Sequence, residues 1–520
     1  PAAQKKDSVK KVVIEDGITN IVDFAFYNCS SLTDITIPDS VTSIGDDAFY
    51  GTPWLTNKRQ ENDSLVIVNG ILIDGTACSG EVTIPNDVTS IGDYAFRNCT
   101  GLTSITIPKS VTSIGGNVFD GCTALTEVLL EGGSALTSES FGEVADKVVT
   151  RWNEDNLTWT LTADGTMTIS GTGAMKNYSN NSPAAQKKDS VKKVVIEDGI
   201  TNIVDFAFYN CSSLTDITIP DSVTSIVNYA FYNCTGLTNI KIPNSVTNIE
   251  GFAFYYCTGL TSVNIPESVT CIGDHAFFIC TSLTSVNISE GVTGIGAWAF
   301  QNCTGLTSIK IPESITSIET GAFSGCTSLA NITIPSSVTS IKESAFSGTA
   351  WLKSKQQKNP LVIVNGILID GTTCSGEVTI PEGITSIGDF AFYDCTSLTS
   401  IKIPKSVTSI ENSAFYNCAG LTSVNMPEGI TSIGDVAFSD CTSLTNITIP
   451  ESVTSIGDAA FFGCRSLTSI EIPRSVTSIG IGVFDNCGKL PEITVSCDST
   501  LAKDAFGDAS EKVKYRHSLV

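Results

Sequence analysis

The stretch Cys395-Thr-Ser-Leu-Thr-Ser-Ile-Lys-Ile-Pro-Lys-Ser-Val-Thr-Ser-Ile-Glu-Asn-Ser-Ala-Phe-Tyr-Asn417 is one unit of a 23-residue repeat, and Cys418 begins the next unit. A fixed period of this size is typical of stacked-repeat solenoids, in which no single unit can bury its own apolar face. We therefore expect a solenoid that grows by the addition of coils. The same spacing relates the cysteines at positions 211, 234, 257, 280, 303 and 326, and those at 395, 418, 441, 464 and 487.

Each unit has three parts. The first is a strand, Leu-x-x-Ile-x-Ile, in which apolar and polar residues alternate, and a proline such as Pro404 follows it and ends the ladder because it lacks an N–H. The second is an extended Val-Thr-Ser-Ile segment. The third often reads Gly-Asp-x-Ala-Phe, as in Gly434–Phe438, where Asp is expected to cap one helical turn and Phe to fill the core. The expected fold is a β-rich, right-handed superhelix with one short strand and a short helical turn per coil.

The charge of the chain excludes several classes of partner. Its 30 basic and 54 acidic residues give a formal net charge of −24. Nucleic acids and anionic membrane surfaces require basic patches, so we expect neither as a partner. Apolar runs such as Leu361–Val364 are only strand-sized, well short of the roughly 20 residues that span a bilayer. We therefore expect no membrane insertion.

Fourteen of the 18 cysteines occupy one repeat position. They are expected to stack at the strand spacing of about 4.8 Å, with parallel side chains that cannot turn toward each other as a disulfide requires. We expect buried thiols and no metal, because His275 and His517 lie far apart in sequence. Thr52 and Thr349 replace cysteine in two coils, which suggests a slot for small residues. The sequence leaves open the state of the remaining cysteines, Cys78, Cys271, Cys374 and Cys497.

Two segments, Trp54–Val82 and Trp351–Val378, interrupt the period in the same way. Each contains Leu-Val-Ile-Val-Asn-Gly-Ile-Leu-Ile-Asp-Gly-Thr, in which Asn-Gly between two β runs predicts a hairpin. The flanking Cys326 and Cys395 are three periods apart, so the second segment should replace a normal coil and keep the register. Its polar lead-in, Lys353–Asn359, is expected to be a surface loop.

Residues 150–182 lack the repeat. Leu157–Ile169 predicts a further hairpin with an Asp-Gly turn, and polar caps of this kind cover the ends of solenoids. Ser138–Val148 resembles Lys503–Val513, so a closing element occurs twice. We predict a solenoid over 1–150 with a truncated N-terminal cap, a hairpin cap over 151–190, and a second solenoid over 191–520 that ends in the closing element. One continuous solenoid with an insertion is the alternative.

Residues 1–44 are identical to residues 183–226. A Trp- and Gly-containing segment precedes the second copy, whereas nothing precedes the first. We therefore expect the natural protein to begin before Pro1, with its targeting signal and its anchor outside this chain.

The motif Leu-x-x-Ile-x-Ile-Pro-x-x-Val-x-x-Ile-x-x-x-Ala-Phe-x-x-Cys resembles the BspA-like class of bacterial leucine-rich repeats over nearly all of 8–149 and 191–510. The segment with Trp159 and Gly171-Thr-Gly173 is similar to a module that often precedes such repeats. The resemblance implies a leucine-rich-repeat solenoid in an extracellular or bacterial cell-surface protein of the adhesin type, which binds host or bacterial surface proteins. It implies no shared catalytic or binding residues.

Polar positions between the inward residues of the strands should form an exposed sheet face. This face has few of the Trp, Tyr and Arg residues that dominate protein-binding hot spots. Two interpretations of this face are therefore possible. It is either a solvated face that binds nothing or a weak, multivalent binding surface. Aromatic residues lie elsewhere, such as Tyr232 and Tyr255 after the core Phe, where they could cover neighbouring coils or dock a partner. The side chains expected to contact a ligand are Lys241, Asn264, Asn287, Lys310, Lys402 and Asn425.

Nothing in the sequence favours catalysis. Acids such as Asp274 and Asp435 occupy equivalent turn positions, and two histidines give little material for a catalytic triad. We expect no catalytic residue and no cofactor. Three functions remain: an adhesin-like module that binds proteins, a structural spacer without a ligand, and a carbohydrate-binding surface, the last weakened by the absence of a row of aromatic platforms on the strands.

Overall fold

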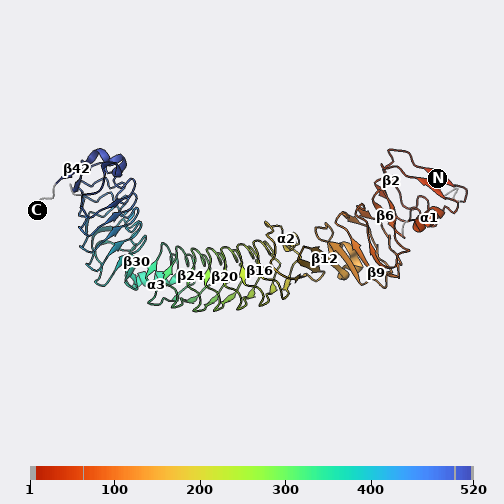
Figure 1. The fold of residues 1–520 in the computed structure, drawn as a ribbon, viewed down its shortest axis with the longest axis horizontal. Coiled ribbons are helices and arrows are strands. Elements are labelled where there is room, and N and C mark those ends of the chain that lie inside the picture. Colours follow the sequence, from red (N-terminus) through yellow and green to blue (C-terminus); the bar gives the residue numbers. More distant parts are fainter. Residues whose placement is uncertain (1–6, 62–63, 497–498, 517–520) are drawn as a thin grey trace. The chain divides into compact units, whose positions relative to one another are not determined.

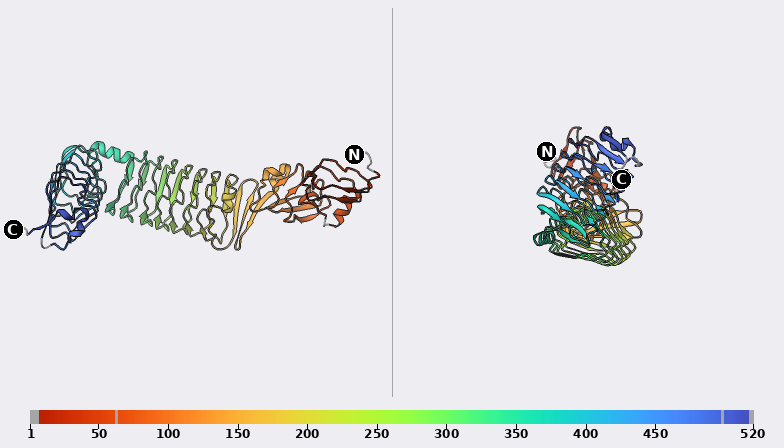
Figure 2. Two further views of the ribbon diagram at one scale, coloured as in Figure 1. Left: turned by 90° about the horizontal axis from the view of Figure 1, so that it is seen from above. Right: turned by 90° about the vertical axis from the view of Figure 1, so that its left-hand side faces the viewer.

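A computed structural model describes residues 7–61, 64–496 and 499–516. The chain divides into two compact units, residues 1–223 (unit 1) and 224–520 (unit 2). Both are built from stacked coils with parallel strands and little helix (Figures 1 and 2). This confirms the predicted class of fold. A regular coil differs from the expectation in detail, because it has two short strands, for example Asn239–Lys241 and Asn248–Ile249, and a non-helical turn in place of the expected helical turn.

In the part of unit 1 that the structure describes, there are four groups of paired strands and three helical segments. Its strands are β1 (Lys11–Val13) and β3 (Asp34–Thr36); β2 (Asn20–Ile21) and β4 (Ser43–Ile44); β5 (Val66–Val68), β6 (Ile71–Asp74), β8 (Ser90–Ile91) and β10 (Ser113–Ile114); β7 (Gly80–Thr83), β9 (Leu102–Ile107), β11 (Glu127–Glu131), β12 (Val148–Asn153), β13 (Leu157–Thr162), β14 (Thr166–Gly171), β15 (Lys193–Ile196) and β17 (Asp216–Thr218); and β16 (Asn202–Ile203). Its helices are α1 (Pro53–Glu61), α2 (Pro183–Gln186) and the 3-10 segment η2 (Ser138–Lys147).

Unit 2 continues the repeat and contains one insert. Its strands are β18 (Ser225–Ile226), β20 (Asn248–Ile249), β22 (Cys271–Ile272) and β24 (Gly294–Ile295); β19 (Asn239–Lys241), β21 (Ser262–Ile265) and β23 (Ser285–Ile288); β25 (Ser308–Lys310) and β27 (Asn331–Thr333); β26 (Ser317–Ile318) and β28 (Ser340–Ile341); β29 (Val362–Val364), β30 (Ile367–Asp370), β32 (Ser386–Ile387), β34 (Ser409–Ile410), β36 (Ser432–Ile433), β38 (Ser455–Ile456) and β40 (Ser478–Ile479); β31 (Gly376–Thr379), β33 (Leu398–Lys402), β35 (Ser423–Asn425) and β37 (Asn446–Ile447); and β39 (Glu471–Ile472), β41 (Ile493–Ser496) and β42 (Val513–Arg516). Its helical segments are α3 (Ala350–Lys358) and the 3-10 segment η3 (Lys503–Lys512).

The core is a stack of identical layers. Phe254, Phe277 and Phe300 are fully buried, and their ring centroids lie 5.1 and 5.2 Å apart with nearly parallel planes. Most of the leucines, isoleucines, valines and alanines predicted to point inward are buried along both units, and a few, such as Ile44 and Ile479, are partly buried. Burial of each large apolar side chain contributes about 1.5–3 kcal/mol, so adjoining coils stabilise one another.

The turn that carries the core Phe is held by alternating hydrogen bonds. The amide of Cys303 donates to the carbonyl of Phe300 within its coil at 3.2 Å, whereas Phe300 donates to Ala322 of the next coil at 2.9 Å. This geometry places two residues per coil in the left-handed region, for example Trp298 at φ 54° and Asn302 at φ 59°. Asn, Asp and Gly tolerate that conformation, which explains why they usually precede the ladder cysteine.

The aspartate of the turn does not cap a helix, so that expectation was wrong. The Asp435 carboxylate accepts from the backbone N–H of Asp458 at 2.8 Å, and Asp458 accepts from Ile481 at 2.7 Å. Each acceptor thus satisfies an amide 23 positions further on, where an unpaired N–H would be costly. The aspartates connect coils.

The ladder cysteines are buried, as predicted. The Cys257 thiol donates to the carbonyl of Phe231 in the preceding coil at 3.1 Å, and Cys303 donates to Phe277 at 3.1 Å. Thr52 and Thr349 stand at this position where a helix follows, and Thr349 Oγ1 accepts from the amide of Leu352 at 3.1 Å. A hydroxyl therefore replaces the thiol where a helix N-cap is needed.

Both predicted insert hairpins are present. β5 pairs antiparallel with β6, and β29 with β30, with Asn365 and Gly366 at φ 49° and 80° in the second turn. The expected surface loop over Lys353–Asn359 is wrong, because the helix α3 runs from Ala350 to Lys358. Lys and Gln are good helix formers, and the Thr349 cap starts the helix.

The hairpin predicted over Leu157–Ile169 is also present. Its strands β13 and β14 pair antiparallel around Gly165, at φ 90°. On one side β13 pairs with β12, which is parallel to β11 of the preceding coil; on the other, β14 pairs with β15 of the following repeats. The division into two tandem solenoids with a cap stays a prediction.

Candidate ligand-binding surfaces

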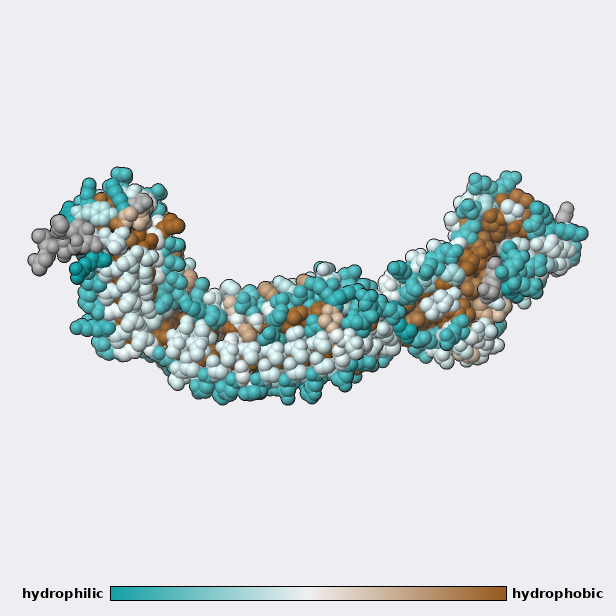
Figure 3. Space-filling model, viewed as in Figure 1, coloured by the Kyte–Doolittle hydropathy of each residue, from teal (hydrophilic) through white to brown (hydrophobic). Residues whose placement is uncertain are grey.

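The six predicted site residues all lie on the strand face and are exposed. Parallel register aligns Lys241 with Asn264 and Asn264 with Asn287. After the insert, Lys402 is aligned with Asn425. The predicted exposure is confirmed, and a role in binding stays a prediction. In Figure 3 the coils of unit 2 show mainly white and teal atoms, as expected for a surface rich in Ser, Thr and Asn.

Neighbouring rungs of the strand face interact. The Asn287 amide donates to Asn264 Oδ1 at 2.5 Å, and the Lys310 ammonium lies 3.1 Å from Glu290. Beside this column the Thr261 hydroxyl donates to the carbonyl of Thr238 in the preceding coil at 3.0 Å. Hydrogen bonds between short side chains and neighbouring coils thus hold this surface in place. An exposed ion pair such as Lys310–Glu290 contributes little stability.

An outer aromatic ladder, which sequence reasoning did not identify, follows the turns of unit 2. Tyr229, Phe252, His275 and Trp298 stack with centroids 4.8, 4.7 and 5.1 Å apart. Burial between these rings lowers the pKa of His275. Because neighbours cover both ring faces of Phe252 and His275, these residues offer only edges to a ligand. The signal for the ladder was the aromatic residue that often precedes Ala in the repeat.

Each insert shortens the turn of its coil. Val82 follows Leu72 by ten positions, whereas their strand partners Ile105 and Ile91 are fourteen positions apart. The second insert has the same difference between its strands and their partners. Trp54 replaces the missing core ring, with its centroid 4.7 Å from that of Phe49. The shortened turn carries no outer ring, and a pocket lies beside it in both units.

The first insert pocket, of about 390 Å³, is enclosed by α1 and the turns on either side of the insert. Tyr27 covers one face of Tyr50 at 5.3 Å, and Tyr50 lines the pocket with half of its surface exposed. On the opposite side the Arg97 guanidinium lies 4.9 Å from the ring centroid of Tyr94. The other polar lining residues include Asp47, Arg59, Asp74, Thr76, Asp93 and Asn98.

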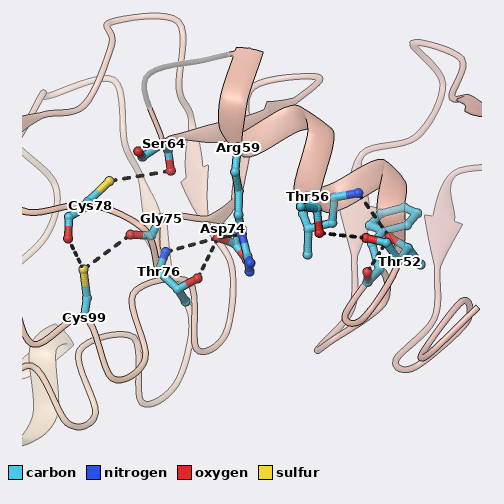
Figure 4. A network of polar contacts seen from close by, with 11 residues as sticks. Thr52, Thr56, Arg59, Ser64, Asp74, Gly75, Thr76, Cys78 and Cys99 are labelled. Carbon is cyan, nitrogen blue, oxygen red and sulfur yellow. Dashed lines mark hydrogen bonds and ion pairs between the residues drawn. The ribbon is translucent and has the colours of Figure 1, made fainter. Parts of the chain in front are cut away.

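A polar network joins three residues that line this pocket, Arg59, Asp74 and Thr76 (Figure 4). Arg59 donates two hydrogen bonds to the buried Asp74 carboxylate, at 3.0 and 2.5 Å. Thr76 donates to the same carboxylate through its amide at 3.1 Å and its hydroxyl at 3.0 Å.

A second carboxyl group that lines this pocket is partly buried. Burial raises the pKa of Asp47, although the nearby Arg97 opposes the shift.

The second insert pocket, of about 500 Å³, has one aromatic wall. Phe390 and Tyr393 form that wall, and Tyr416 covers the far face of Tyr393 at 5.1 Å. Ser344 and Ser347 line the opposite side. Polar residues at its edge are Lys342, Glu343, Gln356, Asp370 and Asp389.

Two of these edge residues show the environment of the second pocket. Burial raises the pKa of Asp389, and Lys342, 4.0 Å away, opposes that shift. Gln356, equivalent to Arg59 of the first insert, donates to Asp370 at 3.1 Å. The same architecture therefore recurs with a different distribution of charge.

The cysteines off the ladder differ in exposure. Cys78 and Cys374 are buried and Cys271 is exposed, whereas Cys497 lies outside the described residues, as does His517. Within residues 7–61, 64–496 and 499–516, no three His, Cys, Asp or Glu side chains lie close enough to hold a metal ion. Among the same residues, no helix has the length and apolar character needed to cross a membrane.

Comparison with known proteins shows the family. The family model for the "BspA type Leucine rich repeat region (6 copies)" matches residues 2–126, 74–145, 182–303, 247–366 and 370–491. The chain belongs to the BspA-type leucine-rich repeat family. This is a family of bacterial cell-surface repeat proteins. No curated protein matches the chain significantly.

Several solved structures are similar to this BspA-type chain. A leucine-rich repeat protein from Bacteroides ovatus is 28% identical, with a TM-score of 0.39, and the match covers 70% of this chain and 99% of that one. A leucine rich cell surface protein from Faecalibacterium prausnitzii is 32% identical, with a TM-score of 0.37 and coverage of 68% and 96%. A leucine-rich repeat protein from Eubacterium ventriosum is 25% identical, with a TM-score of 0.41 and coverage of 64% and 94%.

Proposed function

We propose that this chain is a non-catalytic, adhesin-like module at a bacterial cell surface, and that its strand face binds an extracellular protein of a host or of another bacterium. Family membership supports the location, because BspA-type repeats belong to bacterial surface proteins. The observation that carries the proposal is the column of exposed Lys241, Asn264 and Asn287, held in register by paired strands.

Such a surface suits weak contacts repeated many times. Its short Ser, Thr and Asn side chains lose less conformational entropy on binding than long side chains would, and the parallel strands beneath them fix their spacing. Each contact contributes little because aromatic anchors are few. Several contacts made by one partner at once raise the overall affinity, since later contacts form at high effective concentration. Lys241, Lys310 and Lys402 supply positive charge in an otherwise acidic chain.

The test measures binding to purified extracellular-matrix and bacterial envelope proteins by biolayer interferometry. A variant with Lys241→Glu, Lys310→Glu and Lys402→Glu should weaken binding at least tenfold. The matched control places the same three changes at the exposed Lys355, Lys358 and Lys489 and should bind within twofold of the wild type. Binding should survive enzymatic removal of glycans from the partner.

Two results would contradict the proposal. One is binding no stronger than that of a repeat protein whose surface residues have been shuffled, which would favour a structural spacer. The other is an equal loss of binding in both triple variants, which would show that net charge and not the strand face is responsible.

A further inference from the structure

The strongest unassigned feature of the molecule is the pair of insert pockets. Each occupies the place where a normal turn would carry an outer ring, and the insert turn is shorter than the regular turn by the same number of residues in both units. The core position is refilled by Trp54 or Trp351, whose centroids lie 4.7 and 5.0 Å from the preceding Phe ring. The outer position is not refilled, and the pockets open there.

The spacing of the coils gives the size of this gap. Tyr50 and Arg97 occupy equivalent positions two coils apart, so they are separated by roughly 10 Å. A six-membered ring inserted halfway would lie about 5 Å from each wall. Rings at this same position in neighbouring regular coils stand at a similar distance, for example 5.0 Å between Tyr232 and Tyr255. A ring-shaped ligand therefore fits as an additional rung.

The chemistry of the walls selects the kind of ring. In the first pocket Tyr50 presents an aromatic surface, whereas Asp47, Asp93 and Asn98 supply hydrogen-bonding groups around it. A wholly apolar ring would take water from these groups without replacing its hydrogen bonds, at about 1–3 kcal/mol for each group left unsatisfied. Among the described residues, the Asp93 carboxylate would keep only the bond that it accepts from the amide of Gly116. A pyranose has C–H groups on its faces and hydroxyls around its rim, so it matches an aromatic wall with a polar border.

The second pocket repeats this asymmetry. Phe390 and Tyr393 form the apolar side, Ser344 and Ser347 form the polar side, and Asp389 lies at the edge. We propose that both insert pockets are saccharide-binding sites, each taking one pyranose ring of an oligosaccharide in place of the missing outer rung. This is a different surface from the strand face and a different class of ligand from the protein partner proposed above.

The experiment begins with a glycan array of pyranose oligosaccharides, with maltotriose, cellotriose and chitotriose among the probes. The saccharide bound most strongly is then examined by saturation-transfer difference NMR with the full chain. Stacking on Tyr50 and Tyr393 predicts stronger transfer to the C–H protons of one ring face than to those of the other. A combined Tyr50→Ala and Tyr393→Ala variant should weaken binding at least tenfold, and each single variant should remove only one of two sites.

Controls separate loss of the site from loss of the fold. Tyr50→Trp with Tyr393→Trp should retain binding, because the aromatic wall is kept. Tyr232→Ala removes a tyrosine that stacks on Tyr255 away from both pockets, and it should bind like the wild type. The proposal is overturned if no pyranose binds on the array. It is also overturned if the double alanine variant keeps full affinity, or if only Lys241→Glu and Lys310→Glu abolish binding, which would place the sugar on the strand face.

Discussion

Replacement of Gly371 by alanine tests whether the shortened insert turn is required by the ring beside it. A Cβ atom at this glycine would lie 2.3 Å from Phe392 Cε1 and 2.7 Å from Cδ1. Non-bonded carbons prefer about 3.5–4.0 Å, so ring or backbone would have to move by more than about 1 Å. The ring has little room, because it is fully buried and stacks on Phe415 at 5.0 Å.

The expected cost follows from this geometry. Overpacking of a tight core costs about 1–3 kcal/mol, and the immobility of Phe392 places Gly371→Ala at the upper end, at about 2–3 kcal/mol. The loss should be local because each coil contacts mainly its neighbours. Since about 1.4 kcal/mol corresponds to a factor of ten, the amides around Phe392 should exchange roughly 30- to 150-fold faster.

Hydrogen exchange followed by mass spectrometry provides the assay. The informative peptides contain the amides of Gly371, bonded to Ala391 at 2.6 Å, and Phe392, bonded to Ala414 at 2.7 Å. Gly488→Ala is the control, because nothing lies within 4 Å of its added Cβ. Equal effects of the two substitutions, or unchanged exchange near Phe392 in Gly371→Ala, would refute the reasoning.

Three further predictions follow from the contacts described above. Thr349→Ala should destabilise α3 by about 1 kcal/mol, seen as faster amide exchange over 350–358, whereas Thr349→Ser should not, because Ser keeps the oxygen that accepts from Leu352. Arg59→Ala leaves the buried Asp74 carboxylate with fewer hydrogen-bond donors and should lower the urea midpoint of unit 1. The decrease should be more than twice that caused by Arg59→Gln, because Gln356 donates to the equivalent Asp370 in unit 2. Equal effects of the two substitutions would disprove this role. Burial raises the pKa of Cys257 to about 12, so in a Cys497→Ser background native protein at pH 8 should be alkylated by iodoacetamide mainly at the exposed Cys271. Because unfolded thiols titrate near 9.0, the stability that the protonated thiols provide is complete below that pH and is lost as the pH rises toward 12, so a thermal midpoint that does not fall over this range would contradict the assignment.

The repeat predicted the regular parts of the fold well. A period of 23 residues with alternating apolar positions determines which residues point inward, so the strands, the phenylalanine stack and the buried thiols could all be predicted. Asn-Gly specified the insert hairpins, because both of its residues adopt the left-handed conformation that the turn needs.

The interpretation failed where a residue had two roles open to it. The polar residues of Lys353–Asn359 indicated a loop, but Lys and Gln are also good helix formers. The Thr349 N-cap starts a helix here, and the segment therefore continues as α3. The turn aspartates could cap a helix or bond the next coil, and only the stacking distance selects the second. The insert pockets depend on a turn shortened relative to its neighbours, which becomes visible only when strand partners are known.

Stacking by nearest neighbours also determines how the molecule would respond to a pulling force. A coil adds roughly 4.8 Å to the stack, yet its 23 residues reach about 80 Å when drawn straight. Under tension the coils would unfold one at a time. Each unfolded coil would become more than ten times as long as the thickness that it occupied in the stack. Such a chain would absorb a sudden load in small, recoverable steps.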